Sequence, residues 1–142
     1  MFWDSSAVVP LLLAEARSAE LSALLATDAA PAIWSFTAVE CHSALYRRRR
    51  EATLPSPVVR EAVQRLDAFC QDATEISPTD VVRRRAARLL ATHSLRAGDA
   101  LQLAAALVWC QENPQRERFV CLDERLREAA GAEGFWVTPE II

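Results

Sequence analysis

Short apolar segments alternate with longer segments of helical periodicity along this chain, and this alternation restricts the folds open to it. The segments that read as strands are residues 1–4, 32–36, 74–77, 118–122 and 135–138. Predicted helices lie between them at residues 5–14, 16–27, 38–52, 57–72, 80–93, 97–111 and 124–130. Strands that alternate with helices indicate an α/β fold. We therefore expect a short, central, mostly parallel sheet of about four to five strands, flanked by about seven helices.

The size and composition of the chain favour one soluble domain. The 142 residues can enclose a sizeable core, so residues 1–142 are treated as a single domain. Apolar residues make up 51%, which excludes a disordered chain, and the net charge of −3 argues against a protein that coats nucleic acid. No basic leader precedes the first predicted strand, and no apolar run could span a bilayer. We expect a cytoplasmic protein with no membrane partner.

The cysteines and histidines do not suggest a site of their own. The four cysteines are Cys41, Cys70, Cys110 and Cys121. They are far apart and form no C-x-x-C pair, which argues against zinc and favours reduced, mostly buried thiols. His42 and His93 are predicted to have no catalytic role, since the first lies about 200° round a helix from Glu40 and the second ends a helix.

Four acidic residues stand where predicted strands end or predicted helices begin: Asp4, Glu40, Asp99 and Asp123. The carboxyl ends of parallel strands share one edge of a sheet, where sites form at topological switch points. Carboxylates gathered there repel one another unless a cation neutralises them, and Mg²⁺ takes oxygen ligands of this kind. The pattern therefore predicts a metal centre at that edge, with Mn²⁺ as the alternative ion.

Each acid also has an explanation that requires no metal. Asp4 and Asp123 precede helices, where Asp is a favoured N-cap. Thr37 and Glu40 have the spacing of a capping box, in which the Glu reaches back to a backbone N–H. Asp99 lies in the first turn of its helix, where the helix dipole stabilises an acid. Capping and metal binding are compatible, because a capping carboxylate keeps lone pairs free. Both interpretations stay open.

Taken together, the four segments resemble the four motifs of the PIN-domain nucleases, and in particular those of VapC-type toxins from bacterial toxin–antitoxin pairs. The similar segments are D-S-S-A at Asp4, S-x-T-x-x-E at Glu40, R-A-G-D-A-L-x-L-A-A-A-L at Asp99 and F-V-C-L-D at Asp123. The resemblance covers essentially the whole chain, in order. One position departs from it, because Cys121 stands where relatives often have Ser or Thr.

The resemblance implies a PIN-like fold in which Asp4, Glu40, Asp99 and Asp123 are the metal-binding and catalytic acids. It also makes Ser6 and Thr37 the polar residues that contact substrate beside the first two acids. The implied activity is that of a Mg²⁺-dependent endoribonuclease, the toxin of a VapBC-type pair, which hydrolyses an RNA phosphodiester bond with a metal-activated water. The implied partners are RNA, a cognate VapB-like antitoxin and a second copy in a homodimer.

Arginine supplies all 16 basic residues of the chain. The run Arg47–Arg50 follows Glu40 on the same predicted helix, so Arg47 is a candidate for gripping a phosphate of the substrate. Arg96 precedes Asp99 by three residues and is a nearer candidate. A second cluster, at residues 83–85 and 88, is interpreted as a solvated helix face.

Two other functions stay open. One is a catalytically inactive PIN-like module that acts through a complex with an antitoxin and nucleic acid. The other is a metal-dependent phosphohydrolase of small molecules. Enzymes of that kind commonly carry a nucleophilic D-x-D motif, whereas Asp4 is followed by Ser5 and Ser6.

Overall fold

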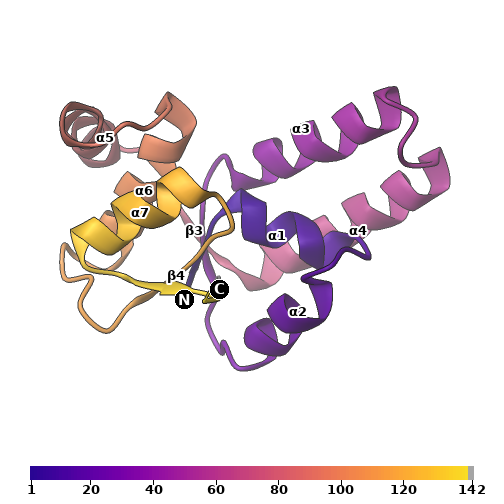
Figure 1. The fold of residues 1–142 in the computed structure, drawn as a ribbon, viewed down its shortest axis with the longest axis horizontal. Coiled ribbons are helices and arrows are strands. Elements are labelled where there is room, and N and C mark those ends of the chain that lie inside the picture. The colour runs from indigo at the N-terminus through magenta and orange to yellow at the C-terminus, as the bar shows by residue number, and fades with distance from the viewer. Residues whose placement is uncertain (141–142) are drawn as a thin grey trace.

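Five parallel strands form one sheet with helices on both faces in the computed structural model, which describes residues 1–140 (Figure 1). The strands are β1 (Phe2–Trp3), β2 (Ala32–Trp34), β3 (Thr74–Ile76), β4 (Arg118–Val120) and β5 (Trp136–Thr138). The helices are α1 (Ser5–Leu12), α2 (Ser18–Ala26), α3 (Thr37–Arg50), α4 (Ser56–Asp72), α5 (Asp80–Thr92), α6 (Ala97–Trp109) and α7 (Glu124–Glu133). The predicted α/β fold is confirmed, and the sheet is parallel throughout.

The strand order is β3-β2-β1-β4-β5, which places β1 in the centre of the sheet. The chain first builds outward from β1 to β3, and then returns to add β4 and β5 on the other side of β1. This reversal makes the carboxyl ends of β1 and β4 a topological switch point, where α/β sheets form their crevices. Asp4 follows β1 at this point, and its backbone N–H donates to Val120 O at the end of β4 (2.9 Å).

Successive side chains of each strand point into two different cores, because side chains alternate across a sheet. Phe2, Trp34 and Phe119 pack with α5, α6 and α7 on one face. Trp3 and Ile33 pack with α1 to α4 on the other face. Figure 1 shows the two groups of helices on either side of the sheet. Helices therefore cover β1, β2 and β4 on both faces of the sheet, as is typical of parallel sheets.

Helix α6 is apolar on nearly all sides, and it packs against β2, α5 and α7. Its C-terminal half is buried through a run of small residues, 104–106, that allows close approach to its neighbours. Thr79 is the N-cap of α5 and accepts from Val82 N. The predicted last helix, residues 124–130, is longer in the structure: α7 continues to Glu133, and Gly134 ends it in the left-handed conformation at φ 106°.

Helices α3 and α4 pack against each other and project from the body as a hairpin (Figure 1). Leu45 of α3 and Leu66 of α4 are buried between these two helices and α1.

All four cysteines are free thiols; Cys41 and Cys121 are buried, and Cys70 and Cys110 are half-buried. Within residues 1–140, no helix is both long enough and apolar enough to cross a membrane.

Candidate active site

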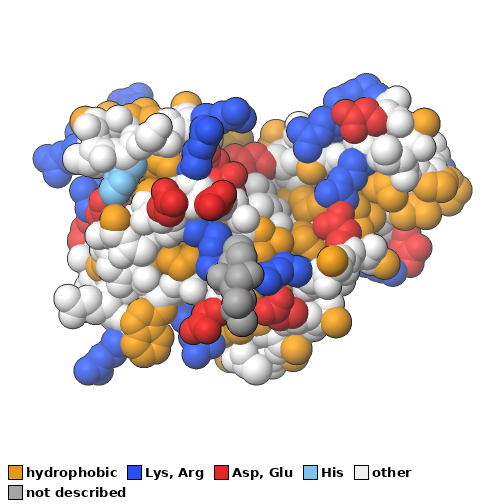
Figure 2. Space-filling view, in the orientation of Figure 1, with side chains coloured by type: hydrophobic (Ala, Val, Ile, Leu, Met, Phe, Trp, Pro, Cys, Tyr) orange, Lys and Arg blue, Asp and Glu red, His pale blue; other side chains and the backbone are white. Residues whose placement is uncertain are grey.

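A cavity of about 550 Å³ opens at the carboxyl ends of the central strands, and all four predicted acids line it. Asp4 follows β1, Glu40 lies in the first turn of α3, Asp99 in the first turn of α6, and Asp123 precedes α7. Figure 2 shows acidic side chains gathered between the two groups of helices, with basic side chains nearby. Segments separated by up to 119 positions in the sequence thus supply one site, as the topology predicts.

Asp4 is buried and is held on one of its two oxygens. Its Oδ2 accepts from the backbone N–H of Ser6 (2.9 Å), from Ser6 Oγ (2.5 Å) and from Cys121 Sγ (3.5 Å). The first of these bonds makes Asp4 the N-cap of α1, so the predicted capping is confirmed. Since all three bonds end at Oδ2, the capping role leaves Oδ1 with its lone pairs available.

Burial raises the pKa of Asp4 from 3.8 to about 6, and the charge of Glu40 adds to the increase. The hydrogen bonds from Ser6 act in the opposite direction, because they stabilise the carboxylate. Burial also raises the pKa of Asp99, followed by the charge of Asp123, with Arg96 and Arg125 opposing. Asp4 and Asp99 therefore carry an electrostatic cost that a bound cation would relieve.

Glu40 does not form the capping box that its spacing from Thr37 suggests. Thr37 is the first residue of α3, and its Oγ1 accepts from Trp34 N (3.2 Å). The Glu40 carboxylate extends across to α6, where its Oε2 accepts from Gln102 Nε2 (2.8 Å). The capping explanation for Glu40 is thus wrong, because the position of α6 gives the side chain a tertiary partner.

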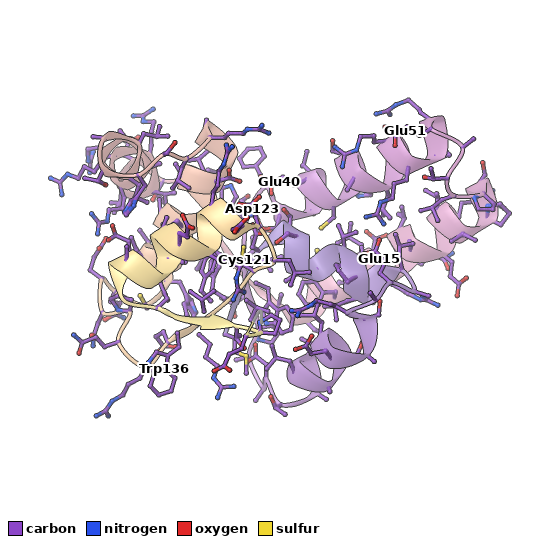
Figure 3. All side chains as sticks on the ribbon, in the orientation of Figure 1. Glu15, Glu40, Glu51, Cys121, Asp123 and Trp136 are labelled. Carbon is purple, nitrogen blue, oxygen red and sulfur yellow. The ribbon has the colours of Figure 1, made fainter. Side chains whose placement is uncertain are left out.

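Asp123 is an N-cap, and its Oδ1 accepts from Leu126 N (2.9 Å). Figure 3 shows Asp123 and Glu40 on the same side of the molecule, with Cys121 below them at the end of β4. Asp99 is not the N-cap of α6: that residue is Arg96, which makes no side-chain capping bond. A hydrogen bond to the backbone of Arg96 instead lowers the pKa of Asp99 and so opposes the effect of burial. The helix N-terminus still favours its negative charge.

Ser6 ties the ends of the two central strands together. Its Oγ donates to Asp4 and accepts from Leu122 N (2.8 Å) just beyond β4. Cys121 lies beside this hydroxyl, with Sγ 3.6 Å from Ser6 Oγ. Ser6 lines the cavity, whereas Thr37 is fully buried beneath it. Their roles as substrate contacts stay predictions.

Three arginines line the same cavity, namely Arg47, Arg48 and Arg96. Arg48 is paired with Glu15, which also lines the cavity and which Figure 3 shows beyond Glu40, toward the α3–α4 hairpin. Arg47 and Arg96 are exposed; Arg47 lies on α3 and Arg96 immediately precedes α6. Their roles as phosphate contacts stay predictions.

The donor set fits a hard divalent cation, which prefers oxygen ligands. Four carboxylates line the cavity, and the hydrogen bonds to Asp4, Glu40 and Asp123 each end on one oxygen and leave the other. Among residues 1–140, however, no three His, Cys, Asp or Glu side chains lie close enough together to hold an ion as they stand. Binding would therefore require these side chains to close around the ion.

The remaining predictions for this region have clear outcomes. His42 stacks on Tyr46 (5.7 Å between ring centroids), His93 bonds Glu133 (2.7 Å), and neither lines the cavity. Two partners were missed by the sequence reasoning: Glu15, which holds Arg48, and Gln102, which holds Glu40. A polar residue inside the apolar run of α6 was the available signal for Gln102.

Comparisons with known proteins identify the fold but no family. No protein-family model matches the sequence, and no curated protein matches it. Among solved structures, the chain is similar to one chain of a structure described as a toxin–antitoxin complex from Klebsiella pneumoniae. The TM-score is 0.60 at 17% sequence identity, over 86% of this chain and 85% of that one. At this identity, the similarity shows a shared fold.

Proposed function

We propose that this protein is a Mg²⁺-dependent endoribonuclease that acts as the toxin of a VapBC-type toxin–antitoxin pair. The observation that carries the proposal is the convergence of Asp4, Glu40, Asp99 and Asp123 at one cavity on the switch point of a parallel sheet. The resemblance of these four segments to the PIN-domain motifs supports it. The similar fold of a chain from a toxin–antitoxin complex is a second, independent support.

The four acids would hold the cation, and the geometry indicates what other side chains contribute. Ser6 and Cys121 bond Asp4 on Oδ2, which would leave Oδ1 for the cation. A bound Mg²⁺ would supply a more acidic water and neutralise charge on the scissile phosphate. Arg47 and Arg96 would bind phosphates on either side of that position. Because the cavity is open, an RNA strand can cross it without presenting an end.

The partners and location follow from the same proposal. The toxin would have a cognate VapB-like antitoxin, form a homodimer, and act on RNA in the cytoplasm. An acidic site flanked by arginines suits an antitoxin segment that presents basic side chains to the acids and carboxylates to Arg47 or Arg96.

The test is cleavage of total RNA by the purified, antitoxin-free protein, with Mg²⁺ or with EDTA. Asp99→Asn is the site variant, and Asp67→Asn, an exposed acid on α4, is the matched control. We expect discrete fragments that disappear with EDTA and in Asp99→Asn but persist in Asp67→Asn. Absence of cleavage by the folded protein in Mg²⁺, on every RNA tested, would contradict the proposal.

The inactive binding module is the second candidate, and one observation favours it. No three potential ligands among residues 1–140 are spaced to hold an ion. That candidate predicts no change in melting temperature at millimolar Mg²⁺ and no cleavage. Turnover of a small aryl phosphate, assayed beside the RNA, would instead indicate a phosphohydrolase of small molecules.

A further inference from the structure

Helix α6 buries one polar side chain among apolar residues. Gln102 is 1% exposed and is surrounded along the helix by Ala100, Leu103 and Ala104. Burying an amide without partners costs about 1–3 kcal/mol in protein mutational data. A leucine would fill a similar volume without that cost, so packing alone does not explain a glutamine here.

The amide of Gln102 connects two residues of α3. Its Nε2 donates to Glu40 Oε2 at 2.8 Å and to Thr37 Oγ1 at 3.3 Å. Thr37 is in turn fixed to the end of β2, because Trp34 N donates to its Oγ1. A continuous set of hydrogen bonds therefore runs from the backbone of β2 through Thr37 and Gln102 to the carboxylate of Glu40.

Helix α6 also approaches the other oxygen of Glu40. A Cβ atom at Gly98 would lie 3.4 Å from Glu40 Oε1, in van der Waals contact, so the backbone of α6 at Gly98 lies next to that oxygen. Asp99 follows Gly98, and Gln102 lies one turn further along, on the same face as Asp99. One face of α6 thus carries an acid of the cavity and the donor that holds another.

We propose that Gln102 is a positioning residue that holds Glu40 by Oε2 and leaves Oε1 for a divalent cation shared with Asp99. The inference rests on the proposed function, because it takes Glu40 as a cation ligand. A neutral amide suits this task, since it donates to the carboxylate without competing for the cation. Partners of metal ligands that act in this way commonly change metal affinity by 10- to 100-fold when they are removed.

The experiment is titration of the purified full-length chain with Mn²⁺, with free Mn²⁺ measured by electron paramagnetic resonance and no RNA present. Gln102→Leu removes the donor and keeps the volume, and Gln102→Met is a second variant in case the first does not fold. Gln64→Leu, on the exposed face of α4, is the matched control. We expect Mn²⁺ affinity to fall about 10- to 100-fold in both Gln102 variants and to stay unchanged in Gln64→Leu.

A double-mutant cycle separates positioning from a general structural effect. In a Glu40→Gln background, Gln102→Leu should change Mn²⁺ affinity less than about twofold, because the residue acts through Glu40. Equal losses in both backgrounds would overturn the inference. The inference would also be overturned if Gln102→Leu and Gln102→Met bound Mn²⁺ with an affinity within twofold of that of the parent protein.

Failure of the proposed function has a different signature. If the parent chain binds no Mn²⁺, the assignment of Glu40 as a cation ligand fails together with the metal-dependent function. If it binds Mn²⁺ and cleaves RNA while the Gln102 variants match it, only the inference about Gln102 fails. The hydrogen bond between Gln102 and Glu40 is tested separately by NMR. The chemical shift of the Gln102 side-chain amide in the parent protein is compared with its shift in Glu40→Gln.

Discussion

Each edge of the sheet carries a cavity and an acid with little exposed side chain, Asp28 at the amino edge and Asp4 at the carboxyl edge. The two acids differ in how many of their oxygens accept hydrogen bonds. At the amino edge, Asp28 uses both oxygens: Oδ1 accepts from the Met1 amino group (3.2 Å) and Oδ2 from Trp3 Nε1 (2.8 Å). At the carboxyl edge, Asp4 is bonded on Oδ2 alone. The cavity beside Asp28, of about 650 Å³, is lined mainly by apolar side chains.

The two cavities are of similar size, and the acids beside them differ in how their oxygens are bonded. An acid whose two oxygens both accept hydrogen bonds has a structural role. Asp28 is such an acid, and it joins the N-terminus and β1 to the loop before β2. An acid that is buried with a free oxygen beside other acids weakens the fold unless a ligand compensates it. The carboxyl edge, at the switch point, carries an acid of the second kind, Asp4, with three further acids beside it.

The largest expected effect tests this contrast at Asp4. Replacing it with Asn should stabilise the metal-free protein by up to about 3 kcal/mol at neutral pH, because the buried charge is removed. RNA cleavage should be lost in the same variant. Urea unfolding in EDTA measures the stability, and an equal or lower unfolding free energy for Asp4→Asn would contradict the cost assigned to this carboxylate.

The same carboxyl predicts a pH dependence of definite sign. The unfolded chain releases the Asp4 proton near pH 3.8 and the folded chain near pH 6, so in this interval the folded state binds more protons. Stability of the metal-free protein should therefore fall as pH rises from about 4 to about 6 and level off above. Asp4→Asn should reduce the slope, leaving the smaller part from Asp99, whose pKa is also raised.

At the amino edge, Asp28→Asn should have the opposite effect on stability. Loss of the charged partner of Met1 and Trp3 should cost about 2 kcal/mol, since hydrogen bonds to charged groups contribute about 1.5–3 kcal/mol. RNA cleavage should be retained once the protein is folded. A stable Asp28→Asn variant without activity would show that the amino edge belongs to the functional site.

Metal binding should offset the loss of folding stability that the buried charge of Asp4 and the partly buried charge of Asp99 cause. At about ten times its dissociation constant, Mg²⁺ should stabilise the protein by about 1.4 kcal/mol at pH 8. Thermal unfolding with and without Mg²⁺ measures the effect, and Asp99→Asn is the control in which it should shrink. An unchanged melting temperature in the parent protein would argue against a cation site formed by these acids.

The smallest expected effect concerns the two helical glycines. Gly98→Ala should change stability by less than about 1 kcal/mol through helix propensity, but its methyl group would lie 3.4 Å from Glu40 Oε1. Mn²⁺ affinity should therefore decrease, by less than about tenfold. The matched control is Gly131→Ala in α7, where the added carbon would meet Val137 Cγ2 at 3.8 Å and leave the affinity unchanged.

The sequence by itself predicted the α/β fold and placed the four acids at one edge. Both conclusions depend on local signals: apolar alternation marks the strands, and parallel strands bring their carboxyl ends together whatever the connecting helices contain. The N-caps at Asp4, Thr79 and Asp123 were predictable for the same reason, because a cap depends on residues two or three positions away.

Only the tertiary structure decided what each acid contacts. Glu40 bonds Gln102, 62 positions away, instead of closing a capping box with its own helix. Arg48 pairs with Glu15, 33 positions away, beside the cavity. Asp28, an unremarkable loop acid in the sequence, becomes a fully bonded structural residue. Local pattern cannot specify such pairs, because they depend on the distance and rotation between packed elements, which the whole core determines.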